Sequence, residues 1–264
     1  MKKAFTLAEG ATHVAMPNKM RQVAFTLAEV LITLAIIGVV AALTIPTLVQ
    51  NYQKKQWVSG LQKGYATLNN VFKMAMATDG VDSITQTSLW QALPYCDSWG
   101  SRCSGDSSKD YSAFISELNK YLKVNKYYNP DEFTSIKYKI LDGRDYDGDL
   151  TKMYRLKIYS ADGIVYYLRF HVNGYREEFK STWLGYIEID VNGDNSPNQH
   201  GRDLFEVIVF DNGKLLFPGT QEWADNGGDH WDEDSLTCNP SVSYYAAGDY
   251  CGARIFEQGW KMDY

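Results

Sequence analysis

The chain has 264 residues, of which 45% are hydrophobic, 22% are charged and 14% are aromatic. That balance excludes wholesale disorder and allows one large domain or two small ones. The net charge of −6 is unevenly spread, because residues 1–24 hold four basic residues against one glutamate, a net +3, so the other 240 residues carry −9. Nucleic-acid binding needs a basic surface, and the acidic body therefore argues against nucleic acid as a partner.

Residues 25–49 form a long apolar run with a single charged residue, Glu29. A helix needs about 20 apolar residues to cross a bilayer, so the run predicts a membrane span. The basic residues before it predict a cytoplasmic N-terminus and an exported body. A secretory signal would end its apolar run at a small-residue cleavage site, whereas this run ends near the polar Asn51.

The segment AFTLAE at residues 24–29, followed by the apolar run, resembles the start of type IV pilins and type II secretion pseudopilins. The resemblance implies cleavage between Ala24 and Phe25 by a membrane prepilin peptidase, and methylation of the new Phe25 amine. Members of that family more often have Gly before the cut, so Ala24 departs from their pattern. A plain signal anchor that carries one glutamate is the alternative interpretation.

The same hexapeptide also occurs at residues 4–9, where no spanning run follows it. That copy cannot present a membrane helix, so we interpret it as a duplicated leader segment without an assembly role.

Glu29 is the one charge inside the predicted span. A carboxylate in the apolar phase costs roughly 2.5–3.5 kcal/mol even on lenient insertion scales, so it needs a partner. We expect none nearby on its own helix, but cleavage would create one in the Phe25 ammonium. The resemblance implies pairing between Glu29 of one subunit and the Phe25 amine of another. The hypothesis is that Glu29 sets the axial register when copies of the chain and other pilin-like subunits assemble on an inner-membrane platform.

The helix is predicted to continue beyond the span to Thr78, because apolar residues recur there at spacings of three and four. The sequence Thr78-Asp79-Gly80 is a stop signal. Pro46 has no N–H and is expected to kink or loosen the helix. The apolar stripe consists of Trp57, Leu61, Tyr65, Leu68, Phe72 and Ala75.

The chain therefore divides into a cleaved leader at 1–24, a span at 25–49, an amphipathic continuation at 50–80 and an exported head at 81–264. The head should begin with a loop at 81–109 and a helix at 110–125, for which Asp110 is a plausible N-cap. Turn residues at 161–163 and 211–213 predict two hairpins. Strands are expected at 136–141, 153–159, 164–170, 185–191, 205–210 and 214–217.

A helix followed by strands predicts the α+β class, with a long N-terminal helix packed on a globular head that contains an antiparallel sheet. The pilin family has that architecture, so the resemblance implies the same fold.

Three acidic loops, at residues 142–149, 190–203 and 225–234, are candidates for calcium, which takes several oxygen ligands. The second loop alternates oxygen-bearing side chains as an EF-hand loop does, but it has Asn195 at the sixth position and Gly201 at the twelfth. Some pseudopilins carry calcium in a comparable loop, which favours this one. The alternative is that Asp, Asn and Gly favour turns. The candidate ligands are Asp190, Asn192, Asp194, Asn198 and Asp203.

The four cysteines form two local pairs, Cys96 with Cys103 and Cys238 with Cys251. Neither spacing is CxxC, which disfavours a zinc ribbon or a thioredoxin-like motif. If the body is exported, each pair is expected to form a disulfide. Four buried free thiols are the alternative.

We expect no enzymatic activity, because the sequence has no GxSxG, HExxH or P-loop motif. His200 and His230 lie in polar loops, where solvated side chains are expected. The sequence predicts a prepilin or pseudopilin, held in the inner membrane with its head outside the cytoplasm until it joins a pilus or pseudopilus. The alternative is a monomeric, membrane-anchored binding protein that uses the same processing signal.

Overall fold

The chain divides into two compact units, residues 1–48 and 49–264. The first unit contains the start of the long N-terminal helix, and the second contains the rest of that helix and the strands. The computed structural model describes residues 26–94, 110–129, 132, 137–145, 156–170, 175–176, 179–232, 238–241 and 247–264.

Helix α1 runs from Leu27 to Asp79 and continues through Pro46 without a break. It ends at Gly80, whose φ of +66° suits a residue without a side chain. The predicted end of the helix is confirmed. Among the described residues, α1 is the helix that is long and apolar enough to cross a membrane.

The remaining described helices are short. Two of them, η1 and α2, lie in the segment that was expected to be a loop. The Thr87 hydroxyl caps α2 by accepting a hydrogen bond from the Trp90 amide at 3.1 Å. The helices are η1 (Ile84–Gln86), α2 (Ser88–Gln91), α3 (Ser112–Leu118), α5 (Gln221–Asp225) and α6 (Cys251–Glu257).

The strands form an antiparallel sheet in the order β1-β2-β3-β5-β6-β7, with β4 paired to β5. The fold class is therefore α+β, as predicted. Both predicted hairpins are present, β2–β3 and β6–β7, with Gly163 and Gly213 at positive φ in their turns. The strands are β1 (Val124–Tyr128), β2 (Leu156–Ser160), β3 (Val165–Phe170), β4 (Tyr175–Arg176), β5 (Ser181–Asp190), β6 (Leu204–Phe210) and β7 (Leu215–Leu216).

The helix predicted at residues 110–125 is wrong in its second half. Helix α3 stops at Leu118, and the Asn119 carboxamide oxygen then accepts a hydrogen bond from the Val124 amide at 2.9 Å. Residues 124–128 pair with β2, a partner about thirty residues further along the chain. Asp110 lies just before the helix and accepts a hydrogen bond from the Ser112 amide at 2.8 Å.

The strand predicted at residues 136–141 is also wrong over its described part, 137–141. Only isolated bridges occur there, from Lys139 to Asp145 and to Gln199. The chain turns back on itself instead, because the Ile140 amide bonds to the Arg144 carbonyl at 2.9 Å.

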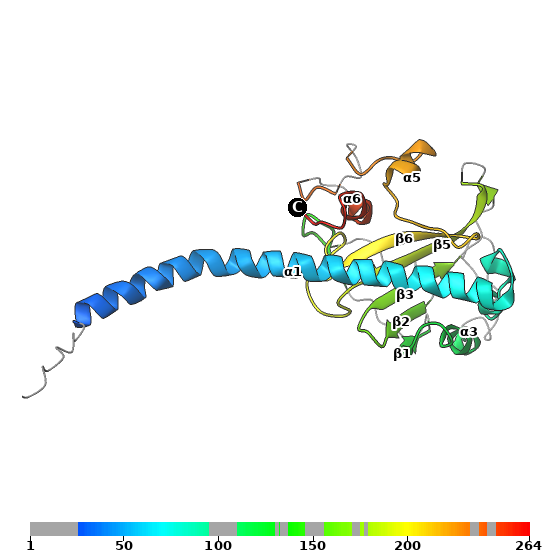
Figure 1. The fold of residues 1–264 in the computed structure, drawn as a ribbon, viewed down its shortest axis with the longest axis horizontal. Helices are drawn as coiled ribbons and strands as arrows, with labels where there is room; N and C mark the ends of the chain where they lie inside the picture. The colour runs from blue at the N-terminus through cyan, green and yellow to red at the C-terminus, as the bar shows by residue number, and fades with distance from the viewer. Residues whose placement is uncertain are drawn as a thin grey trace, which may run out of the picture. The chain divides into compact units, whose positions relative to one another are not determined.

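The core of the second unit lies between α1 and one face of the sheet. In Figure 1 the cyan part of α1 lies over the sheet, with β5 and β6 on one side of it and β3 and β2 on the other. The predicted stripe is confirmed: five of its residues are buried and Tyr65 is partly buried. Burying each large apolar side chain contributes roughly 1.5–3 kcal/mol, so the stripe holds the helix to the sheet. The buried members are Trp57, Leu61, Leu68, Phe72 and Ala75.

Two glycines let α1 approach β5 closely. A Cβ atom on Gly64 would lie 2.7 Å from Ile189 Cγ2, and one on Gly60 would lie 2.8 Å from Val191 Cβ. Both distances are shorter than a carbon–carbon contact allows, since that optimum is about 3.5–4.0 Å. The helix therefore lies directly against β5 and its continuation.

Replacing Gly64 with Ala is expected to lower the free energy of unfolding of the second unit by about 1–3 kcal/mol, because the new methyl group overlaps Ile189. Chemical denaturation of the full-length protein in detergent measures the change. Gly38→Ala is the matched control, since a Cβ there meets no atom within 4 Å. Equal stability of Gly64→Ala and the parent protein would contradict the close approach.

Candidate functional site

The first unit exposes a continuous apolar surface on α1. Large side chains are exposed throughout this part of the helix, with Leu27 at 78% and Leu43 at 73%. Exposed apolar surface of this extent marks a membrane or protein interaction site. The exposed residues of this surface include Leu31, Ile32, Leu34, Ile36, Ile37, Val39, Val40, Ile45 and Leu48.

Glu29 lies in the first turn of α1, where it forms a capping box with Thr26. The Thr26 amide and hydroxyl donate hydrogen bonds to Glu29 Oε2 at 2.8 and 2.7 Å, and the Glu29 amide donates to Thr26 Oγ1 at 3.2 Å. The first amides of a helix have no hydrogen-bond acceptor within the helix. This reciprocal pair supplies side-chain acceptors for two of these amides.

The expectation that Glu29 has no partner on its own helix is therefore wrong. The pattern Thr-x-x-Glu before an apolar run is itself the sequence signature of a capping box, and it was available in the sequence. Both hydrogen bonds use Oε2, so Oε1 has no partner among the described residues.

Residues 19–45 match the family model described as the prokaryotic N-terminal methylation motif. This chain carries the signature of type IV pilin-like and pseudopilin-like proteins. The motif supports a prepilin-like protein that is processed at its N-terminus. No curated protein and no solved structure matches the chain. The matched segment includes Ala24, Phe25 and Glu29, of which the first two lie outside the described residues.

The second unit holds two buried carboxylates at the junction of β5 and β6, one at the end of β5 and one in the loop just before β6. Asp190 and Asp203 have no exposed surface. The Tyr138 hydroxyl donates to Asp190 Oδ2 at 2.6 Å. The amides of Asn198 and Gln199 donate to Asp203 at 2.8 and 2.6 Å.

Burial raises the pKa of Asp190 to about 8, and the neighbouring negative charge of Asp203 adds to this effect. Burial also raises the pKa of Asp203, although the Gln199 and Asn198 amides oppose the rise. A carboxyl group without water favours its neutral form, and two adjacent carboxylates repel each other.

Asp194 belongs to the same loop but is exposed and bonds elsewhere. Its carboxylate accepts hydrogen bonds from Lys157 Nζ at 2.8 Å and from the Tyr159 hydroxyl at 2.7 Å. The Asn192 and Asn198 carboxamide oxygens are buried and have no hydrogen-bond partner among the residues that the structure describes.

The structure thus brings four of the five candidate calcium ligands near one another and directs Asp194 towards Lys157. In the described part of the chain, no group of three or more His, Cys, Asp or Glu is placed to hold a metal ion. The three carboxylates already accept hydrogen bonds from protein donors. Calcium binding by this loop stays a prediction. Residues 146–149 and 233–234 of the other two acidic loops lie outside the described residues.

Two histidines expected in solvent are instead largely covered. The His200 side chain is 3% exposed and its Nδ1 lies 3.4 Å from Asp249 Oδ1. The His230 side chain is 15% exposed and its Nε2 lies 3.0 Å from Glu257 Oε2. Tertiary packing of the C-terminal segment covers both, which the polar sequence around them does not reveal.

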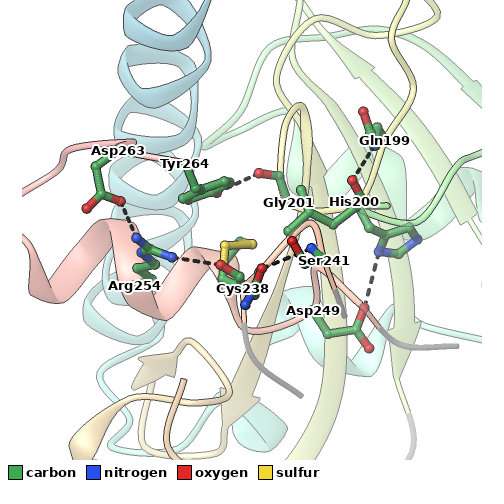
Figure 2. The surroundings of a disulfide bond; sticks show 12 residues. Gln199, His200, Gly201, Cys238, Ser241, Asp249, Arg254, Asp263 and Tyr264 are labelled. Carbon is green, nitrogen blue, oxygen red and sulfur yellow. Dashed lines mark hydrogen bonds and ion pairs between the residues drawn. A yellow bond between two sulfur atoms is a disulfide. The ribbon is translucent and has the colours of Figure 1, made fainter. Parts of the chain in front are cut away.

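The C-terminal segment is fastened to the head by a disulfide between Cys238 and Cys251, whose Cα atoms are 4.7 Å apart. Figure 2 shows Arg254 between two acceptors: it donates to the Cys238 carbonyl and pairs with Asp263, each at 2.7 Å. The Tyr264 hydroxyl donates to the Gly201 carbonyl at 2.6 Å. Cys96 and Cys103 lie outside the described residues.

Asp190→Asn is expected to change how stability depends on pH. A carboxyl group with a pKa of about 8 in the folded state and about 3.9 in the unfolded state binds more protons when folded. The contribution of this carboxyl group to the free energy of unfolding is therefore complete below pH 4. It is lost as the pH rises towards 8, by up to about 1.4 kcal/mol per pH unit. The asparagine keeps an acceptor for Tyr138 but does not titrate.

Denaturation of both proteins from pH 5 to 8 in the presence of a chelator tests this. The stability of the parent relative to Asp190→Asn should fall as pH rises, and parallel pH profiles would contradict the raised pKa. Calcium that stabilised the parent at pH 8 but not the variant would support the calcium prediction.

Proposed function

We propose that the chain is a structural subunit of a type IV pilus or of a type II secretion pseudopilus. The observation that carries the proposal is the methylation motif at the start of helix α1. The apolar side chains of this helix are exposed through residue 49, and the rest of the helix packs into the core of the second unit. One element can then supply both the contact surface of a fibre and the attachment of its head.

In this proposal a prepilin peptidase cleaves between Ala24 and Phe25, and the Phe25 amine is methylated. Before assembly the apolar helix anchors the subunit in the inner membrane, with the head outside the cytoplasm. Afterwards the exposed side chains of several copies, or of this chain and other pilin-like subunits, cover one another. An inner-membrane platform brings the subunits together.

Glu29 then has two roles that use different oxygens. Oε2 caps the helix through Thr26, and Oε1 is available to the Phe25 ammonium of a neighbouring subunit. In an apolar fibre core a charge-assisted hydrogen bond of this kind is stronger than in water and depends on alignment along the fibre. A subunit that is out of register leaves both charges unpaired.

The native protein is expected to begin at Phe25 with a methylated amine. Intact-mass measurement with N-terminal sequencing checks this, and a peptidase-negative strain is the control, in which residues 1–24 are retained. An unmodified start at Met1 in the wild-type strain would contradict the processing.

Glu29→Gln separates the two roles, because a glutamine can still complete a capping box but carries no charge. We expect Glu29→Gln, like Glu29→Ala, to be cleaved normally. The amount of either variant in the sheared filament fraction should be lower than that of the parent by roughly tenfold or more. Thr26→Ala is the matched control, since it removes the capping hydroxyl and keeps the carboxylate. Normal filaments from Glu29→Gln would overturn the proposed ion pair.

A monomeric membrane-anchored binding protein is the alternative, and the N-terminal motif fits it equally. Mechanical shearing distinguishes the two. A filament subunit is released from cells in long particles, whereas an anchored monomer stays with the membrane fraction.

A further inference from the structure

A cavity of about 440 Å³ opens in the second unit, between α1 and the β5–β6 loop. Two of its lining side chains are charged, and both are cations: Lys54 from the helix and Arg202 from the loop. Two aromatic side chains, Trp57 and Tyr264, form walls, and the carboxamides of Gln50 and Gln53 also line it. The volume falls within the usual range of small-molecule sites, which is about 300–1,000 Å³.

The two cations have no carboxylate partner within the described residues. Neither Lys54 nor Arg202 takes part in an ion pair there, and the buried Nε of Arg202 has no hydrogen-bond partner. The carboxyl group next in sequence, on Asp203, is occupied by the Asn198 and Gln199 amides. A local excess of positive charge is unusual in a chain with a net charge of −6.

In the sequence, the helical residues that line this cavity come directly after the apolar run. Gln50 follows Val49, the last residue of that run, and Lys54 comes one helical turn later. A 25-residue helix is about 38 Å long, which exceeds the roughly 30 Å of the hydrocarbon core and reaches into the headgroup layer. Residues 50–54 of an anchored subunit therefore lie at the depth of the phospholipid headgroups.

We propose that this cavity binds the phosphodiester headgroup of a membrane phospholipid while the subunit is anchored. The Arg202 guanidinium and the Lys54 ammonium face the phosphate, and the two carboxamides donate to its oxygens or to the glycerol. Guanidinium groups match phosphate geometry, and basic pockets at the membrane surface bind lipid headgroups. This inference rests on the proposed function, because membrane anchoring is what brings the headgroup to the cavity.

Its consequence is a second hold on the membrane besides the apolar helix. A subunit that leaves the bilayer for a filament must release the lipid. Assembly therefore removes the phosphate from the cavity, and a neighbouring subunit covers the cavity in its place.

Native mass spectrometry of the full-length mature protein in detergent tests the proposal, with dioleoylphosphatidylglycerol as the probe. We expect one retained lipid on the parent protein and a roughly 10- to 30-fold weaker apparent affinity for Lys54→Gln combined with Arg202→Gln. The matched control is Lys55→Gln, which also removes one lysine charge. Lys55 is next to Lys54 in the sequence, but its side chain is exposed and does not line the cavity. The affinity of this control should equal that of the parent.

Dioleoylglycerol, which has the same chains and no phosphate, should not compete for the retained lipid. Equal lipid affinity in the parent and the double variant, or equal competition by dioleoylglycerol, would overturn the proposal. If Arg202→Gln lowers the unfolding midpoint, the lipid affinity of the single variant Lys54→Gln decides the test. The Lys54 side chain is only half-buried on the helix.

Failure of this inference and failure of the proposed function give different results. If the cavity does not bind lipid, the double variant and the parent retain lipid equally while processing at Phe25 is normal. If the chain is not a processed subunit, the N-terminus remains intact and no filaments form, whatever the lipid measurement shows.

Discussion

The fold depends on one constraint: the part of α1 that lies in the first unit is apolar on every side, and none of the described residues covers it. Leu27 and Leu43 remain more than 70% exposed. At about 25 cal/mol for each Å² of apolar surface, leaving so many large side chains in water is unfavourable, which fits a segment covered by lipid or by other protein. The second unit has no such need, since its apolar stripe is covered by its own sheet.

Glu29 is compatible with that constraint because of its position in the helix. At the first turn its carboxylate meets free amides and the positive end of the helix dipole, so its charge is partly compensated within its own chain. The same carboxylate in the middle of the span would have no free amide to accept from. The structure therefore explains how a carboxylate is tolerated at the start of an otherwise apolar helix.

Local sequence patterns sufficed for α1, its end at Asp79 and the two hairpins, because periodicity and turn residues act over a few residues. They failed at residues 124–128 and 137–141, where pairing with distant segments outweighs local preference. Of the candidate site, the motif at residues 24–29 and the capping box formed by Thr26 and Glu29 are both local patterns that the sequence contains. The burial of Asp190 and His200 was not readable, since it depends on Tyr138 and on the C-terminal segment.

The two outer strands of the sheet have a consequence for crowding. On one side β7 is only two residues long, and on the other side β1 is interrupted by a register shift and carries the exposed Lys126. Short, irregular and charged outer strands offer little unpaired backbone to another sheet. The described edges of the sheet therefore give copies of this unit little tendency to join strand to strand, even at high local concentration.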